Sequence, residues 1–279
     1  MTVVLALLGA VFYGLSDFLG GLVSRRTSAW AVAFVASGAG TVFVFALALF
    51  VDGAPGRTDL LWGVVAGVGN GCGTAFLYRG LASGRMGVVA PISAVGAAVV
   101  PVVAGLLGGE RPALLVWLGI LAAFPGIWLV SREPDAAATP ASGGVVDGVL
   151  AGLGFGSLFA ALGQIPDSAG LVPLALNQLV ACVAIAGLAA ALRAPWVPRE
   201  QPALVGIVCG ALGASATVAF LVATHHGDLS VSAILASLYP AFTILLAATV
   251  LKEQIHRAQA VGLVLCAAAV ALVAGGGQA

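Results

Sequence analysis

Charged side chains are scarce in this sequence, and that scarcity is the first constraint on what the protein can be. Of the 279 residues only 8% are charged, whereas 61% are hydrophobic and the mean hydropathy is +1.13. Soluble domains carry charge on about a quarter of their residues, which keeps their surface polar. The sequence therefore predicts a protein whose solvent is lipid. Its net charge is zero and it has no basic patch, which excludes nucleic acid as a partner.

Cysteine pairs, a cleavable leader and catalytic motifs are also missing. The chain has no HExxH motif, no paired acids at catalytic spacing and no phosphate-binding loop, so we predict no enzymatic activity, no metal and no cofactor. No basic region precedes the apolar run Val3–Val23, which predicts a retained membrane span. The cysteines stand singly in apolar runs, which excludes a CxxC site and a disulfide framework and indicates packing residues: Cys72, Cys182, Cys209 and Cys266.

Ten long apolar runs are the main feature that the sequence does have. A helix that crosses the hydrocarbon core of a bilayer needs about 20 mostly apolar residues. Clusters of glycine, proline and charge separate runs of about this length. The predicted spans are Val3–Val23, Ala29–Val51, Leu60–Ala82, Met86–Leu107, Ala113–Val130, Val145–Gly163, Leu171–Leu192, Ala203–Thr224, Leu229–Leu251 and Ala258–Ala274.

A polar insert divides the chain into two copies of one unit. Residues 132–144 have the composition of a flexible linker between a first repeat, 1–131, and a second, 145–279. Glu110 and Glu253 stand 143 positions apart (253 − 110), and the same offset pairs further residues across several spans. These pairs are Gly63 with Gly206, Gly67 with Gly210, Thr74 with Thr217, Gly84 with Gly227, and Gly119 with Gly262.

Each copy has five predicted spans, and an odd number has a topological consequence. The second copy must enter the membrane from the opposite side, as in the inverted repeats of many secondary transporters, whose site lies between the halves near the bilayer midplane. The charged turns at Glu110–Pro112 and Lys252–Arg257 then lie where spans reach water, because charge at the bilayer centre costs several kcal/mol. The predicted fold class is an all-α, polytopic integral membrane protein with ten transmembrane helices in two inverted five-helix repeats.

Two motifs in the chain resemble the EamA domain of the drug/metabolite transporter (DMT) superfamily. They are "PVVAGLLGGERPALLVWLGILAAFPGIWLV" from Pro101 and "YPAFTILLAATVLKEQIHRAQAVGLVLCAAAVALV" from Tyr239, and "VFYGLSDFLGG" at Val11–Gly21 is similar to the family's first span. Gly109, before the acid, departs from the family pattern. The resemblance covers nearly the whole chain. It implies a ten-helix transporter of small solutes, with a central cavity lined by the first, third and fourth helices of each repeat, and it names no cargo.

The third predicted span carries one stripe of small and polar residues. Asn70, Thr74 and Tyr78 recur at helical spacing, so an amide, a hydroxyl and a phenol share one face with several glycines. We expect this face either to contact a solute or only to form hydrogen bonds between helices. In the second copy the corresponding stripe keeps Thr217 but is richer in glycine, so a pocket between the repeats would be asymmetric.

Asp17 is the one carboxylate well inside a predicted span. An acid in that position predicts proton coupling or the binding of a cationic group. Tyr13, one helical turn earlier, is a candidate to share its partner. The alternative is a structural ion pair of Asp17 with Arg79 or Arg25.

Prolines mark the fourth span of each copy. Pro91, Pro101 and Pro240 each remove a backbone donor, so we expect either gating hinges or static kinks there. Ser237 and Tyr239 flank the last of them and are candidate cargo contacts.

The remaining polar residues favour structural roles. We expect Asn177 and Gln178 to form hydrogen bonds between helices. Adjacent residues of a helix point about 100° apart, so His225 and His226 are not expected to chelate a metal. Ser215 lies ten residues before His225, about 15 Å along a helix, which is too far for a serine–histidine catalytic pair.

Basic residues divide unequally between the two sides that this topology defines. The positive-inside rule places the richer side in the cytoplasm and both termini outside, whereas the family resemblance implies termini inside. The poorer side has Arg57 and Arg111, and the richer side has Arg25, Arg26, Arg79, Arg85, Arg132, Arg193, Arg199, Lys252 and Arg257.

Together these features predict a secondary transporter of the plasma membrane that moves a small solute by alternating access, with export as the expected direction. Its partners are the lipid bilayer and the solute, with protons as a candidate coupling ion. The alternatives are a scaffold or sensor without transport and a metal-cation permease of the same superfamily. The oligomeric state is open, and a monomer is compatible with the sequence.

Overall fold

The structure of the protein, a computed structural model, describes residues 1–82, 86–131, 142–250, 252 and 254–276, and every regular element among them is a helix. Two short 3-10 helices, η2 (Asp167–Ala169) and η3 (Gln201–Val205), precede α7 and α8. The α-helices are α1 (Thr2–Ser24), α2 (Ala29–Ala48), α3 (Arg57–Ala82), α4 (Met86–Leu107), α5 (Leu114–Ser131), α6 (Ser142–Leu162), α7 (Val172–Ala191), α8 (Gly206–His225), α9 (Leu229–Ala236), α10 (Tyr239–Val250) and α11 (Arg257–Gly276).

The predicted apolar runs coincide with these helices, with one correction. The ninth run was expected to be one helix, but it is divided into α9 and α10 by a break at Ser237–Leu238. Pro240 lies in the first turn of α10, where a missing N–H costs nothing, whereas a continuous helix would bring its ring against the carbonyl of Ala236. Eight segments, with α9 and α10 taken together, are long and apolar enough to cross a membrane, and the described parts of α4 and α5 are shorter. Ten spans therefore stay a prediction.

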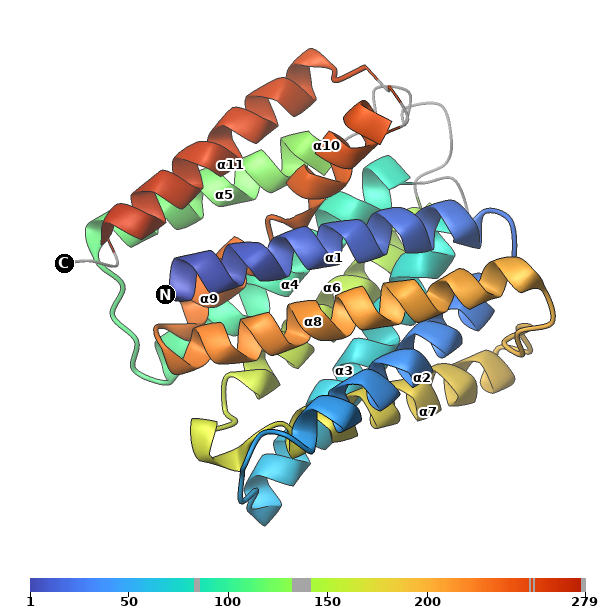
Figure 1. Cartoon of the computed structure of the whole chain (residues 1–279). Helices are drawn as coiled ribbons and strands as arrows, with labels where there is room; N and C mark the ends of the chain where they lie inside the picture. The colour runs from blue at the N-terminus through green and yellow to red at the C-terminus, as the bar shows by residue number, and fades with distance from the viewer. Residues whose placement is uncertain (83–85, 132–141, 251, 253, 277–279) are drawn as a thin grey trace.

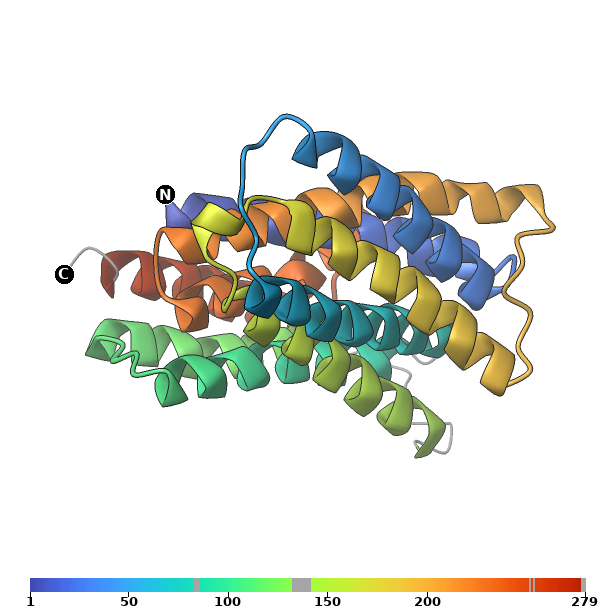
Figure 2. The ribbon, with the colours of Figure 1, turned by 90° about the horizontal axis from the view of Figure 1, so that it is seen from below.

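The helices run roughly along one common direction (Figures 1 and 2). α1 begins and α11 ends at the same end of the bundle, which we call the termini end, and the opposite end is the far end. Followed along the chain in Figure 1, each helix of the second half runs opposite to its counterpart in the first half. Glu110 lies at the termini end, in the turn between α4 and α5, and Lys252 follows α10 at the far end. Glu253 itself lies outside the described residues. This antiparallel relation is what inverted repeats require.

The packing contacts show the same two-fold relation, because a contact of a helix in one half recurs with its counterpart in the other half. α1 packs on α8 as α3 packs on α6, and α2 packs on α8 as α3 packs on α7. α4 contacts α6 as α9 and α10 contact α1, while α2 pairs with α7 and α5 pairs with α11. Most strong contacts therefore join one half to the other, and the central space lies between the halves.

Glycines allow these helices to approach at backbone distance. A Cβ added at Gly67 of α3 would lie 2.6 Å from the carbonyl oxygen of Asn177 in α7. At the equivalent Gly210 of α8, an added Cβ would collide with the carbonyl of Ala36 in α2. This glycine pair thus makes equivalent close contacts in the two halves, whereas Gly84 of another predicted pair lies outside the described residues.

The basic residues that the structure describes gather at the far end, as the predicted topology requires. Arg25 and Arg26 follow α1 there, and Arg57 and Arg111 lie at the termini end. Arg85 and Arg132, which the prediction assigned to the richer side, lie outside the described residues.

The close approach at Gly210 can be tested with a single methyl group. We expect Gly210→Ala to lower the free energy of unfolding by about 1–3 kcal/mol, because the added carbon overpacks the α2–α8 contact. Gly187→Ala in α7 is the matched control, since nothing lies within 4 Å of its added Cβ. It should leave stability unchanged or raise it by up to about 1 kcal/mol. Unfolding in mixed micelles measures both, and equal stability of the two variants would contradict this packing.

Candidate functional site

A polar cavity lies at the centre of the bundle, with lining residues from both halves of the chain. Residues of α1, α2, α3, α6, α7, α8 and α10 form its wall. Its volume is about 50 Å³, which is room for a few water molecules. In this conformation the space suits a small solute, and a larger one would require the helices to separate.

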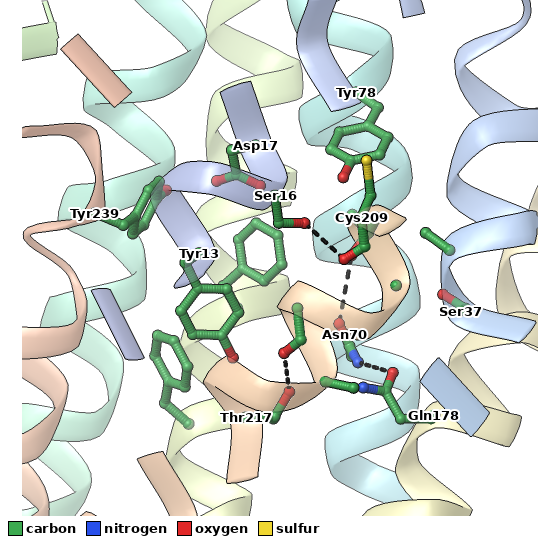
Figure 3. Close-up of a pocket in the computed structure, with 17 residues that line it drawn as sticks. Tyr13, Ser16, Asp17, Ser37, Asn70, Tyr78, Gln178, Cys209, Thr217 and Tyr239 are labelled. Carbon is green, nitrogen blue, oxygen red and sulfur yellow. Dashed lines mark hydrogen bonds between the residues drawn. The ribbon is translucent and has the colours of Figure 1, made fainter. Parts of the chain in front are cut away.

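Seven of the eight predicted cargo contacts line this cavity, although they come from four different helices (Figure 3). Ser237 is the exception: it is buried beside the α9–α10 break, and its hydroxyl has no hydrogen-bond partner in the described part of the chain. The role of these residues in binding stays a prediction. The seven are Tyr13, Asp17, Asn70, Thr74, Tyr78, Thr217 and Tyr239.

An amide cluster joins α3 to α7 at one side of the cavity. Asn70 Nδ2 donates to Gln178 Oε1 at 3.1 Å and, more weakly, to Asn177 Oδ1 at 3.4 Å. Thr74 Oγ1 donates to Asn70 Oδ1 at 3.4 Å. Both expectations for Asn70 therefore apply, because it faces the cavity and also joins helices. Gln178 was assigned only to helix contacts, and this is incomplete, since it lines the cavity as well.

Asp17 brings a carboxylate into the cavity, and no described lining residue carries a positive charge to pair with it. No hydrogen bond or ion pair to its side chain is found among the described residues. The suggested pairing with Arg79 is wrong, because the Arg79 guanidinium pairs with Asp147 of α6, with Nε donating at 3.0 Å. Arg79 also lies over the ring of Phe76, 4.5 Å from its centroid.

Hydroxyl groups complete the wall around Asp17. Ser16 Oγ donates to the carbonyl of Cys209 at 3.0 Å, which ties α1 to α8. The Tyr13 hydroxyl is buried near Thr217 and has no hydrogen-bond partner within the described ranges (Figure 3). The Tyr239 hydroxyl lies 3.2 Å from Ser93 Oγ of α4.

The sequence and the fold of this chain match known proteins. The profile of the EamA-like transporter family matches residues 1–132 and 142–275. The chain belongs to this family. A solved structure described only as "Crystal structure of protein" is similar, with a TM-score of 0.69 and 17% sequence identity over 96% of this chain and 97% of that chain. At this identity the likeness shows the fold alone. No curated protein matches the sequence.

The EamA-like match supports two repeats, and it leaves the domain boundaries as a prediction. The two matched segments end at residue 132 and resume at residue 142, within the region predicted as the linker. Members of an EamA-like transporter family are expected to use a cavity between repeats, which agrees with where the cavity lies here.

Cavity residues that the sequence analysis missed are mainly small. Ser16 and Ser37 were not singled out, although each is a hydroxyl within a long apolar run, next to Asp17 or to small residues. Cys209 was assigned to packing, and it lines the cavity too. Composition alone does not separate such small residues from those that face lipid.

The proline predictions have different outcomes. Only Pro240 accompanies a break in a helix, as described above. Pro101 is buried within α4, which continues through it, and Pro91 lies in the same helix at a position whose side chain is outside the described set. A gating role for any of them stays a prediction.

The residues considered for metal binding and for a serine–histidine pair each contact a backbone carbonyl instead of one another. His225 Nε2 lies 2.9 Å from the carbonyl of Ile165, whereas His226 Nδ1 lies 2.9 Å from the carbonyl of Val222. Ser215 Oγ donates to the carbonyl of Ala211, at 2.8 Å within its own helix. Among the described residues there is no cluster of three histidine, cysteine or acidic side chains that could hold a metal.

The amide cluster predicts a specific stability effect. We expect Asn70→Ala to lower the free energy of unfolding by about 1 kcal/mol, because Gln178 and Asn177 lose a shared donor. Thr74→Val should cost less, since it removes only one long hydrogen bond. Unfolding in mixed micelles compares the variants, and a larger effect at position 74 than at position 70 would contradict the assignment.

Proposed function

We propose that this EamA-like protein is a secondary transporter that moves a small polar solute across the plasma membrane by alternating access. The observation that carries the proposal is the polar cavity between two antiparallel halves, with a carboxylate in its wall that has no ion-pair partner among the described residues. Transporters with inverted repeats bind cargo in this place and expose it to each side in turn. The sequence has no ATP-binding loop, so a gradient drives the movement, and export is the proposed direction.

The far end, where the basic residues gather, faces the cytoplasm in this proposal. Both termini are then outside. The ten helical segments, with α9 and α10 as one broken span, each cross the bilayer, and the halves rock about the cavity.

A carboxylate of the first half contacts the second half at the termini end of the bundle. Glu110, in the first half, accepts hydrogen bonds from the backbone N–H groups of Leu229 at 2.6 Å and Ser230 at 3.1 Å. These donors are first-turn N–H groups of α9 in the second half, which have no partner within the helix. The helix dipole favours an anion at this position. This contact between halves must break when the termini end opens.

A second carboxylate weakens this cap, the contact of the Glu110 carboxylate with the N–H groups of Leu229 and Ser230. Asp228 precedes α9, and its pKa is raised, first by burial and then by the nearby Glu110 carboxylate. A raised pKa in the folded protein means that folding disfavours the ionised form. The cost is therefore present at neutral pH and disappears as the pH falls through the folded-state pKa.

The two acids therefore predict opposite stability effects at neutral pH. Glu110→Gln should lower the melting temperature, because α9 loses a charged acceptor for two N–H groups. Asp228→Asn should raise it, since the substitution removes the repulsion and asparagine is a favourable N-cap residue. The gain from Asp228→Asn should vanish at acidic pH, where Asp228 itself is protonated. Thermal unfolding between pH 4 and 8 measures both, and a shift of the same sign in the two variants would show that the cap is misassigned.

Transport itself is tested through Asp17. We expect cells that overproduce the protein to tolerate an inhibitory metabolite, and purified protein to move that compound into sealed vesicles. Asp17→Asn should lower the flux about tenfold or more, because Asp17 is the one carboxylate in the described wall of the cavity. Asp52→Asn, the same change on an exposed residue, is the control.

Flux measured with and without a pH gradient separates proton coupling from cargo binding alone. Full flux with full pH dependence in Asp17→Asn would remove Asp17 from the mechanism. A folded protein that moves no solute in vesicles would instead favour a scaffold or sensor.

A further inference from the structure

We propose that the cargo carries one positive charge on an organic group of the ammonium or guanidinium class, held by the Asp17 carboxylate beside an aromatic wall. This inference rests on the proposed transport function and names the class of its cargo. It follows from the charge of the cavity, from the rings around Asp17 and from the ligands that the cavity does not offer.

The charge of the cavity wall has one sign. Among the described residues that line the wall, Asp17 is the only acidic one, and no lysine, arginine or histidine accompanies it. Burying an unpaired charge in a medium of low polarity is costly, so an ionised Asp17 favours a cargo that supplies the opposite charge. An anion would be repelled, and a zwitterion would bring a carboxylate that the wall does not match. One positive group neutralises the site.

Aromatic rings stand next to this carboxylate. The ring of Tyr13, one turn before Asp17 on α1, packs against Phe159 at 5.7 Å and Tyr239 at 6.3 Å between centroids. All three rings line the cavity, and Figure 3 shows Asp17 in the same part of it as Tyr13 and Tyr239. The faces of such rings attract organic cations, and clusters of them recognise ammonium groups. The carboxylate and the rings therefore favour the same kind of ligand.

The polar groups nearby distinguish an organic cation from a metal ion. Calcium takes six to eight oxygen ligands, usually with several carboxylates, and magnesium demands a near-octahedral set. Here the described wall offers one carboxylate, and the Asn70 amide oxygen already accepts a hydrogen bond from Thr74 Oγ1. The buried hydroxyl of Tyr13 has no partner among the described residues, and it can accept an N–H from the cargo. This arrangement suits a small cation with N–H or N–CH₃ groups.

Pairs of probes that differ in charge and little in shape test the proposal directly. Choline is compared with 3,3-dimethylbutan-1-ol, and guanidinium with urea, by calorimetric titration of the purified full-length protein. We expect at least one cation to bind about tenfold to a hundredfold more tightly than its neutral match, the range of a charge-assisted contact. Asp17→Asn should remove this difference, and Asp17→Glu should keep part of it. A wild-type protein that prefers neither cation overturns the proposal.

Two further variants test the aromatic wall. Tyr13→Leu should weaken cation binding roughly fivefold to twentyfold, whereas Tyr13→Phe should retain most of it because the ring remains. Equal losses of cation binding in the two variants would assign the effect to the hydroxyl and contradict a role for the aromatic ring. Melting temperatures of all variants show that each is folded, and Asp52→Asn again serves as the matched acid-to-amide control.

Flux in sealed vesicles separates failure of this inference from failure of the proposed function. Movement of a neutral or anionic solute that persists in Asp17→Asn would overturn the cargo class and leave transport intact. Tight, Asp17-dependent cation binding without flux of that cation would support the binding site and count against transport.

Discussion

The close approach of helix backbones at glycine is the constraint on which the rest of this structure depends. In lipid, apolar side chains gain little by leaving their solvent, so helices associate through dispersion contacts that small residues permit. Gly67 and Gly210 occupy equivalent places in the two halves and bring α3 onto α7 and α8 onto α2. Since these contacts join one half to the other, they also set the width of the space between the halves. The cavity is a consequence of that packing.

Polar side chains are then free to line the cavity, because glycines make much of the contact between helices. On one side Asn70 donates a hydrogen bond to Gln178 across α3 and α7. Near α1 the groups are left open, with Asp17 unpaired among the described residues and the hydroxyl of Tyr13 without a partner. The two halves are thus alike in backbone and different in chemistry, since the amide and phenol of α3 face the glycine-rich α8. A cargo in this space meets an amide cluster on one side and aromatic rings with a carboxylate on the other.

The sequence was sufficient for the helices and the repeat, because apolar length and a constant offset are local or periodic signals. It also indicated seven of the residues that line the cavity, since a polar residue within an apolar helix is conspicuous. The ion pairs could not be predicted from the sequence. Arg79 contacts Asp147, 68 positions away, only because α3 packs on α6. At Pro240 we expected a gating hinge or a static kink, and not a full break, because a proline removes one hydrogen bond while the surrounding packing decides how far the helix opens. Ser237 lies at that break and not in the described cavity wall, and its role as a cargo contact stays a prediction.

The proposed alternating access would limit how strong the contact of Glu110 with the start of α9 can be. If the contact of Glu110 with α9 were very stable, the termini end would stay closed and the cargo could leave by one side only. Two N–H groups and a helix dipole make it a strong contact. Asp228 beside it carries a like charge at a site where burial already disfavours ionisation, so its repulsion lowers the net stability of the closed state. An acid at a helix start is ordinarily favourable, and here its cost weakens the contact of Glu110 with α9, as the proposed opening at this end requires.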